Sequence, residues 1–144
     1  MKIVLRGEGL RGLKNPRVEG EALVTQMPIS FLGFIDPNTG KVIQKGHELE
    51  GKSIKGKILV FSTGIGSTVG SYVLINLANR GLAPKAIIQR ESDTVTLVGA
   101  VIGEIPLVHR LEKDPLTVIE DGDRVIVDSE KGIVEIEKRE GGSE

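Results

Sequence analysis

The hydrophobic pattern changes its period near the middle of the chain. Ile58–Phe61 is a run of four apolar residues, with the length and β-branched composition of a buried strand. A glycine-rich turn follows, and beyond Ser67 apolar residues recur every four positions, as on one face of a helix, at Val69, Val73 and Leu77. Gly81 stands where helices commonly end, and Pro84 prevents continuation. The pattern therefore predicts a strand, a tight turn and a helix from Ser67 to about Asn79.

Shorter patterns on either side predict a β-rich chain. We expect strands at Lys2–Leu5, Val18–Thr25, Lys41–Ile43, Lys85–Gln89 and Ile105–Val108. Another apolar run, Ile29–Ile35, is closed by a strong turn signal at Asp36–Gly40. The polar, glycine-containing stretch from His47 to Lys57 is predicted to be a surface loop.

The second half of the chain adds one helix and one hairpin. Asp93 or Ser92 is placed to cap a helix over Thr94–Ile102. The expected C-terminal hairpin joins Val125–Val127 to Ile133–Ile136. Residues 138–144 are charged, and we expect a frayed tail there. Taken together, the pattern predicts a single α/β domain over residues 1–144, β-rich around a central strand–glycine turn–helix unit.

Composition limits the function classes. The net charge of −1 and the lack of a basic run argue against nucleic-acid binding, and 3% aromatic residues leave no stacking platform for bases. No apolar run approaches the roughly 20 residues that span a bilayer. The first residues are charged too early for a signal peptide, so we expect a cytoplasmic protein with no membrane partner.

The chain has no cysteine. This excludes thiol nucleophiles and any iron–sulfur cluster ligated by this chain. The two histidines, His47 and His109, are far apart in sequence and indicate no metal site. We expect His47 to be a solvated loop residue and His109 to be structural. Arg90 is expected either in a surface salt bridge or at an anion. Because the chain has no cysteine and only two separated histidines, any metal in the chemistry of this protein must be held by another chain.

Ser67 is the residue whose position most clearly indicates a chemical role. The first turn of a helix carries unpaired N–H donors and partial positive charge, so an anion there, or an alkoxide on Ser67, is stabilised. Gly64 and Gly66 let a ligand approach bare backbone, and Thr68 adds a hydroxyl. We therefore take Gly64, Gly66 and Thr68 as candidate substrate-binding residues. The alternative is that Ser67 only caps the helix, which is a common role of serine.

The glycine spacing also resembles a degenerate dinucleotide fingerprint, with Glu91 near the position of the ribose partner. That fold requires further βαβ units after the fingerprint, whereas here mostly β structure precedes it and a hairpin ends the chain. A β-rich shell around one βαβ core fits the pattern better. A P-loop is excluded because no Lys-Ser/Thr follows the glycines.

Five motifs in combination identify a family resemblance. They are EGEALV (Glu19–Val24), ISFLGFIDPNTG (Ile29–Gly40), GKILVF (Gly56–Phe61), GIGSTVGSYVL (Gly64–Leu74) and APKAII (Ala83–Ile88). Together they resemble the small subunits of archaeal phosphomevalonate dehydratase, which group with the swivelling domains of the aconitase X type. The resemblance extends from Glu19 to about Val134.

The resemblance implies a swivelling β/β/α fold and a large partner subunit that carries a [4Fe–4S] cluster. It implies dehydration of mevalonate 5-phosphate to trans-anhydromevalonate 5-phosphate by the heterodimer. The family's proposed proton acceptor is the serine that closes the Gly-x-Gly-Ser motif, which falls on Ser67. Two alternatives remain: a related hydro-lyase that dehydrates a hydroxyproline, and a non-catalytic binding or regulatory module.

Overall fold

Residues 1–139, the part of the chain that this computed structural model describes, form eight strands and three helices. The strands are β1 (Lys2–Arg6), β2 (Glu8–Gly9), β3 (Arg17–Val24), β4 (Ile58–Phe61), β5 (Ala86–Gln89), β6 (Leu107–His109), β7 (Arg124–Asp128) and β8 (Ile133–Glu137). The helices are α1 (Val69–Asn79), α2 (Thr94–Gly103) and α3 (Pro115–Val118). The strands follow one another across the sheet in the order β1-β8-β7-β3-β4-β5-β6-β2.

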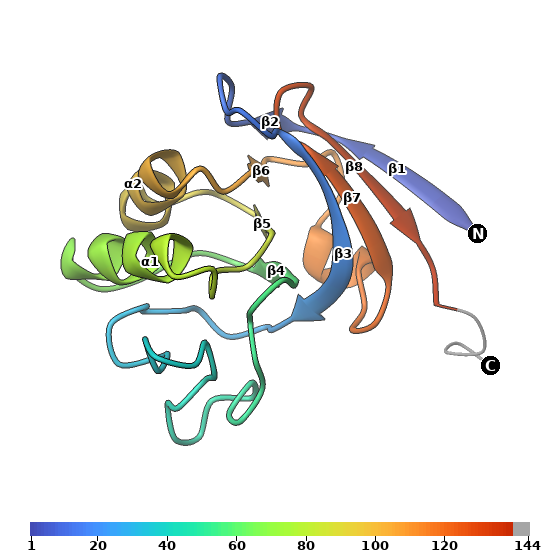
Figure 1. Cartoon of the computed structure of the whole chain (residues 1–144). Coiled ribbons are helices and arrows are strands. Elements are labelled where there is room, and N and C mark those ends of the chain that lie inside the picture. Colours follow the sequence, from blue (N-terminus) through green and yellow to red (C-terminus); the bar gives the residue numbers. More distant parts are fainter. Residues whose placement is uncertain (140–144) are drawn as a thin grey trace.

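The elements are arranged in three layers, with β4 and β5 in the middle (Figure 1). Successive residues of β4 point to opposite sides: Leu59 and Phe61 pack in the core beneath α1 and α2, whereas Ile58 and Val60 pack against β7 and β8. Because both faces of β4 are buried, the strand needs an unbroken apolar run rather than alternation. This arrangement confirms the predicted β/β/α fold.

Strand β3 joins the two sheet layers. Its first part, Arg17–Glu21, pairs antiparallel with β7, and its last part, Ala22–Val24, pairs parallel with β4. The two edge strands, β1 and β2, are separated in sequence only by Gly7, whose N–H donates to the Gly132 carbonyl at 2.8 Å. The chain therefore passes directly from one edge strand of the sheet to the other at this corner.

A long connection, residues 25–57, lies between β3 and β4 beside the helical layer (Figure 1). The predicted strand Lys41–Ile43 was wrong in extent, because only isolated bridges form there, Ile35 with Val42 and Lys41 with Ser53. The connection fills one end of the helix-side core with Phe31, Phe34, Val42, Leu49 and Ile54.

Phe31 ties this connection to the central strand. Its ring lies edge-on to Phe61 and to Phe34, each with centroids 6.1 Å apart. The prediction that His47 is solvated was wrong. His47 is 4% exposed, its ring centroid is 4.9 Å from that of Phe34, and its Nδ1 accepts a hydrogen bond from the Leu49 N–H at 3.1 Å. A lone histidine in a polar stretch gives no sign of such distant packing partners.

Helix α1 begins at Val69, two residues later than predicted, and its buried face is partly different. Val69 is 47% exposed and Val73 is only partly buried. The buried residues of α1 are Gly70, Ser71, Leu74 and Leu77. The reason is the close approach of α2: a Cβ on Gly70 would lie 3.1 Å from Val95 Cγ1, and the Ser71 hydroxyl donates to the Val95 carbonyl at 2.7 Å. Small residues, which a hydrophobicity pattern does not mark, make this contact.

Other predictions are confirmed, including α2, its cap at Asp93 and the hairpin of β7 and β8. The prediction of a frayed tail was wrong for Lys138 and Arg139, which are anchored to Asp123. Lys138 Nζ lies 2.6 Å from Asp123 Oδ2, and the Arg139 N–H donates to Asp123 Oδ1 at 3.0 Å. The remainder of that tail, residues 140–144, lies outside the described residues. No helix within residues 1–139 is long and apolar enough to cross a membrane.

The corrected face of α1 yields a stability prediction. Leu74→Ala removes a fully buried side chain, so we expect the free energy of unfolding to fall by about 2–5 kcal/mol. Val69→Ala, at a half-exposed position, should change it by less than about 0.5 kcal/mol. Urea unfolding of the two variants checks this, and equal losses would show that the face is assigned wrongly.

Candidate functional site

The loops that follow β4, β5 and β6 lie at one edge of the sheet, because these strands run parallel. They carry Ser62–Thr68 after β4, Arg90–Asp93 after β5, and Arg110 after β6. In parallel α/β sheets, ligands bind outside the carboxyl ends of the strands. The predicted glycine turn therefore lies where a site is expected.

The turn is held from both sides at Gly64. On one side, the Ile65 N–H donates to the Ile29 carbonyl at 2.9 Å, and the Ile29 N–H donates to the Thr63 carbonyl at 3.3 Å. On the other side, the Gly64 N–H donates to Asp93 Oδ1 at 2.6 Å. A Cβ on Gly64 would lie 2.5 Å from Asp93 Oδ2, so only glycine permits this approach.

Gly66 reverses the backbone between Gly64 and the helix. Its φ is +100°, and a Cβ there would meet Ser30 Oγ at 2.6 Å, so any side chain would be both strained and obstructed. The next residue, Ser67, is anchored through its carbonyl, which accepts from the Gly70 N–H at 3.0 Å. The Ser67 side chain itself points to an exposed surface.

The capping interpretation of Ser67 was wrong. The N-cap position of α1 is Thr68, whose backbone is already helical at φ −61° and ψ −17°, and no side chain caps the helix there. Within residues 1–139, the Ser67 hydroxyl makes no hydrogen bond. The hydroxyl is therefore free to act on a ligand.

The backbone N–H groups next to this hydroxyl in the sequence are unpaired. Among the described residues, the N–H groups of Gly66, Ser67 and Thr68 donate to no protein acceptor. They lie at the N-terminus of the 11-residue helix α1, where the macrodipole is positive, and residues 62–79 carry no charged side chain. This arrangement can stabilise an anion or an alkoxide. Of the three predicted substrate-binding residues, Gly66 and Thr68 offer a free N–H, whereas that of Gly64 is already bound to Asp93.

The arginines at this edge are already paired. Arg90 Nη2 lies 2.9 Å from Asp114 Oδ2, and its guanidinium lowers the pKa of Asp114 below its ordinary value. Arg110 Nη2 lies 2.6 Å from Glu91 Oε2. His109 Nδ1 accepts from the Ser92 N–H at 2.9 Å, which confirms its structural role. In the part of the chain that the structure describes, no group of three or more His, Cys, Asp or Glu residues is placed to hold a metal ion.

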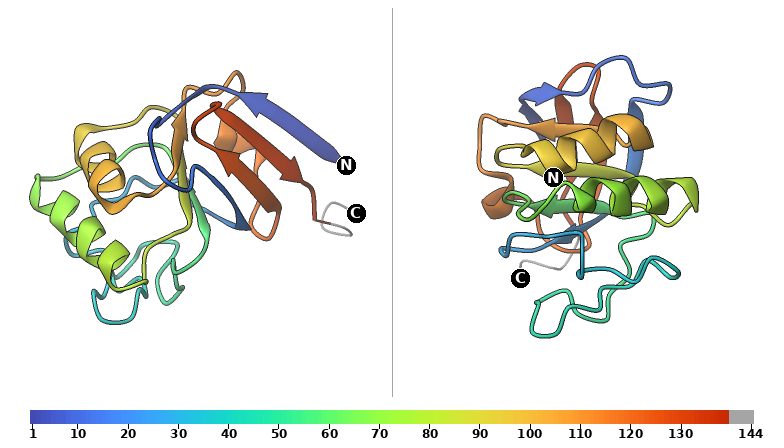
Figure 2. Two further views of the ribbon diagram at one scale, coloured as in Figure 1. Left: turned by 45° about the horizontal axis from the view of Figure 1, so that its top comes forward. Right: turned by 90° about the vertical axis from the view of Figure 1, so that its left-hand side faces the viewer.

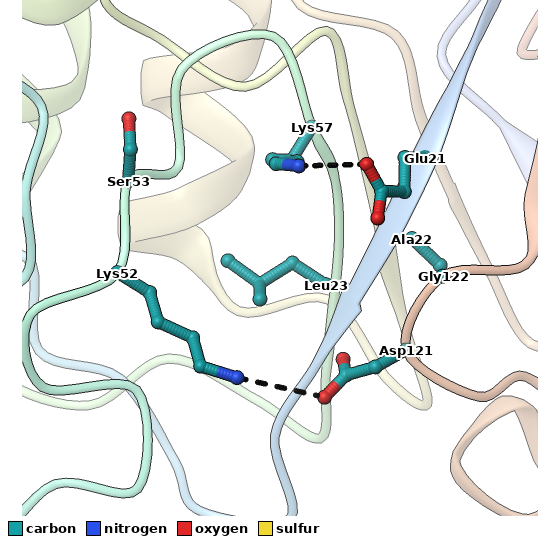
Figure 3. Close-up of a pocket in the computed structure, with 8 residues that line it drawn as sticks. All are labelled: Glu21, Ala22, Leu23, Lys52, Ser53, Lys57, Asp121 and Gly122. Carbon is teal, nitrogen blue, oxygen red and sulfur yellow. Dashed lines mark hydrogen bonds and ion pairs between the residues drawn. The ribbon is translucent and has the colours of Figure 1, made fainter.

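A larger cavity, of about 350 Å³, has no residue of the glycine turn in its lining (Figure 3). Ala22 in its lining pairs with Ile58, the first residue of β4, so the cavity is at the opposite end of that strand. Its cations face carboxylates: Lys57 Nζ is 2.9 Å from Glu21 Oε1, and Lys52 Nζ is 3.9 Å from Asp121 Oδ2 (Figure 3). The cavity therefore offers an anion no uncompensated charge and is not part of the candidate site.

An apolar groove of about 130 Å³ runs between α1 and α2, which lie side by side (Figure 2, right). It is lined by Thr68, Ser71, Tyr72, Ile75, Thr94, Val95, Val98 and Ile102. Tyr72 is 68% exposed and Ile102 is 60% exposed, and neither helix carries a charged residue. Contiguous exposed apolar surface of this kind is typical of protein–protein contacts. The groove begins at Thr68, directly beside Ser67.

Several known proteins are similar to this chain over most of its length. The family model described as Aconitase X swivel domain matches residues 9–136. The phosphomevalonate dehydratase small subunit of Methanosarcina mazei is 53% identical over 124 residues, 86% of each chain. The crystal structure of Thermococcus kodakaraensis aconitase X in its holo-form superposes with a TM-score of 0.86 at 42% identity, covering 94% of this chain and 99% of that chain. The solution NMR structure of a UPF0107 protein has a TM-score of 0.81 at 46% identity, covering 94% of this chain and 100% of that one.

The free hydroxyl of Ser67 yields a second stability prediction. Since Ser67 does not cap α1, Ser67→Ala should change the free energy of unfolding by less than about 0.5 kcal/mol. Asp114→Ala serves as the comparison, because Asp114 caps α3 by accepting from the Leu116 N–H at 3.0 Å and its loss should cost about 0.5–2 kcal/mol. Thermal unfolding of both variants measures the difference. A loss at Ser67 as large as that at Asp114 would restore the capping role.

Proposed function

The chain belongs to the aconitase X swivel domain family, and from this premise we propose that it is the small subunit of a hydro-lyase acting on mevalonate 5-phosphate. The product is trans-anhydromevalonate 5-phosphate. The observation that carries the proposal is the free Ser67 hydroxyl beside three unpaired N–H groups at the carboxyl edge of the sheet. The name of the Methanosarcina mazei relative favours mevalonate 5-phosphate over a hydroxyproline.

Ser67 removes the proton in this proposal. The Ser67 alkoxide takes a proton from the carbon next to the substrate carboxylate, the C–H electron pair becomes the new C=C bond, and the tertiary hydroxyl leaves with its own bonding pair. A serine hydroxyl is a poor base near neutral pH, so its alkoxide must be stabilised. The N–H groups of Gly66 and Thr68 and the N-terminus of α1 supply that stabilisation.

The proposed partner is a large subunit, because the Methanosarcina mazei relative is named a small subunit. A [4Fe–4S] cluster on that subunit supplies the Lewis acid for the departing hydroxyl when bound. The ligands must come from the partner, because this chain has no cysteine. We expect cations for the phosphate and carboxylate to come from the partner as well, since Arg90 and Arg110 already face carboxylates. Neither subunit should turn over substrate alone. We also propose a cytoplasmic location for the pair.

Turnover of Ser67 variants tests the catalytic role. Ser67→Ala and Ser67→Asn both remove the hydroxyl, so both should lose at least about 100-fold in kcat, the lower range for a general base. Both should still assemble with the large subunit. Steady-state dehydration of mevalonate 5-phosphate by the reconstituted pair is the measurement. Ser53→Ala, which removes a hydroxyl that lines the distant cavity, should keep wild-type turnover. Substantial activity in the Asn variant would refute the role of Ser67 as the base.

The location of the cluster is tested separately. Incubated alone with iron and sulfide under anaerobic conditions, this chain should remain colourless, because it offers no thiolate ligand. The reconstituted pair should show iron–sulfur absorbance. A cluster that assembles on this chain by itself would contradict the assignment of the ligands to the partner.

A further inference from the structure

We infer that Asp93 is a positioning residue for Ser67, because its carboxylate holds the backbone of the Gly64–Ser67 turn in place. The inference rests on the proposed function, in which Ser67 removes the substrate proton. Asp93 lies in the loop between β5 and α2 and is partly buried. It makes no hydrogen bond to Ser67 and acts only through the backbone of Gly64, within the part of the chain that is described.

The two oxygens of the Asp93 carboxylate serve different elements. Oδ2 caps α2, since it accepts from the Thr96 N–H at 2.9 Å and from the Thr96 hydroxyl at 3.0 Å. Oδ1 accepts from the Gly64 N–H at 2.6 Å and from Gln89 Nε2 at 2.9 Å. A carboxylate has about four acceptor sites, so all of its capacity is used. Asp93 therefore has none left for the substrate proton and is not itself the base.

Capping α2 would require only one of these oxygens. The contact from Oδ1 reaches across 29 residues of sequence to the turn after β4 and determines where the Gly64 N–H points. Gly64 is the residue that this contact requires, because a Cβ would lie 2.5 Å from Oδ2 and 2.6 Å from Thr96 Oγ1. With Ile29 bonded on the other side of the turn, Asp93 closes a clamp on Gly64, three residues before Ser67.

The charge of Asp93 suits this role. Burial by itself raises the pKa of Asp93, but hydrogen bonds from Thr96, Gln89 and Gly64 outweigh it and hold the pKa below its ordinary value of 3.8. The carboxylate is therefore ionised near neutral pH, and its hydrogen bond to the Gly64 N–H is charge-assisted. The Gly64 N–H is thus committed to Asp93 and that of Ile65 to Ile29, so the N–H groups without a protein acceptor near the Ser67 hydroxyl are those of Gly66, Ser67 and Thr68, within the described residues.

Asp93→Asn tests the inference, because asparagine caps helices as well as aspartate but has a single acceptor oxygen. It cannot accept from the Gly64 and Thr96 N–H groups together in the same geometry. In the reconstituted pair we expect kcat for mevalonate 5-phosphate to fall by about 10- to 100-fold, as a small misplacement of a reacting group does, with KM changed by less than about 2-fold. Asp93→Ser, which can cap α2 but is too short to reach Gly64, should behave in the same way.

A second readout does not depend on activity. In the ¹H–¹⁵N spectrum of this chain, the Gly64 amide proton should move upfield in Asp93→Asn and lose about 10-fold in hydrogen-exchange protection, because a charge-assisted hydrogen bond is lost. The UPF0107 relative, whose structure was determined in solution, shows that NMR suits a chain of this fold. An unchanged Gly64 signal would overturn the inference whatever the activity.

Asp123→Asn is the matched control. Asp123 is 1% exposed and accepts from the Glu120 N–H at 2.8 Å, but it lies beside Ala22, at the end of β4 away from Ser67. We expect Asp123→Asn to lose stability and keep wild-type kcat and an unchanged Gly64 signal.

Wild-type kcat in Asp93→Asn with an altered Gly64 signal would show that the contact between Asp93 and Gly64 does not position Ser67. Failure of both Asp93 variants to fold would show a role in the whole fold and overturn the inference. Wild-type activity in Ser67→Ala would instead refute the proposed function and leave the contact itself intact.

Discussion

The hydrogen bond from the Gly64 N–H to the Asp93 carboxylate joins the two helical connections of the parallel sheet at the edge where the site lies. It acts together with the hydrogen bond from the Arg90 N–H to the Ser62 carbonyl, at 3.2 Å, and with that from the Ser71 hydroxyl to the Val95 carbonyl, at 2.7 Å. The contact engages the Gly64 N–H, whereas those of Gly66, Ser67 and Thr68 have no protein acceptor among the described residues. A single carboxylate thus separates the structural donors of the turn from the donors available for chemistry.

The three-layer core holds in place the loops that make this contact. β4 and β5 are buried on both faces, so the loops at their carboxyl ends start from rigid, closely packed positions. Phe31, packed on Phe61, holds the segment that bonds the other side of the turn. The small residues Gly70 and Ser71 bring α1 close to α2, and the pairing of Phe61 with Gln89 places the loops of Gly64 and Asp93 side by side. The apolar outer surface of these helices is left exposed beside Ser67, and such a surface is typical of protein–protein contacts.

Sequence reasoning succeeded where a segment carries its own signal. The unbroken apolar runs of β4 and β5, the Asp93 cap of α2 and the C-terminal hairpin are all local patterns, and all are present. It failed where distant segments decide the outcome. The face of α1 was misassigned because Gly70 and Ser71 pack against Val95, and the burial of His47 depends on Phe34.

The site shows the same division. The glycine turn and the position of Ser67 were readable from the sequence, but the free state of its hydroxyl was not, because serine at a helix start commonly caps. Asp93 was recognised only as a cap, since its second contact spans 29 residues. The available signal was topological: Gly64 and Asp93 both follow parallel neighbouring strands, and such loops meet at one edge.

The central claim is that the clamped turn presents Ser67 to the substrate carbon that loses its proton. A crystal structure of the assembled pair with bound mevalonate 5-phosphate measures this most directly. The account predicts Ser67 Oγ within about 3–3.5 Å of the carbon next to the carboxylate, the separation of a near-attack geometry, with the contact between Asp93 and Gly64 intact. A Ser67 hydroxyl well beyond that distance, with another side chain against the carbon, would contradict it.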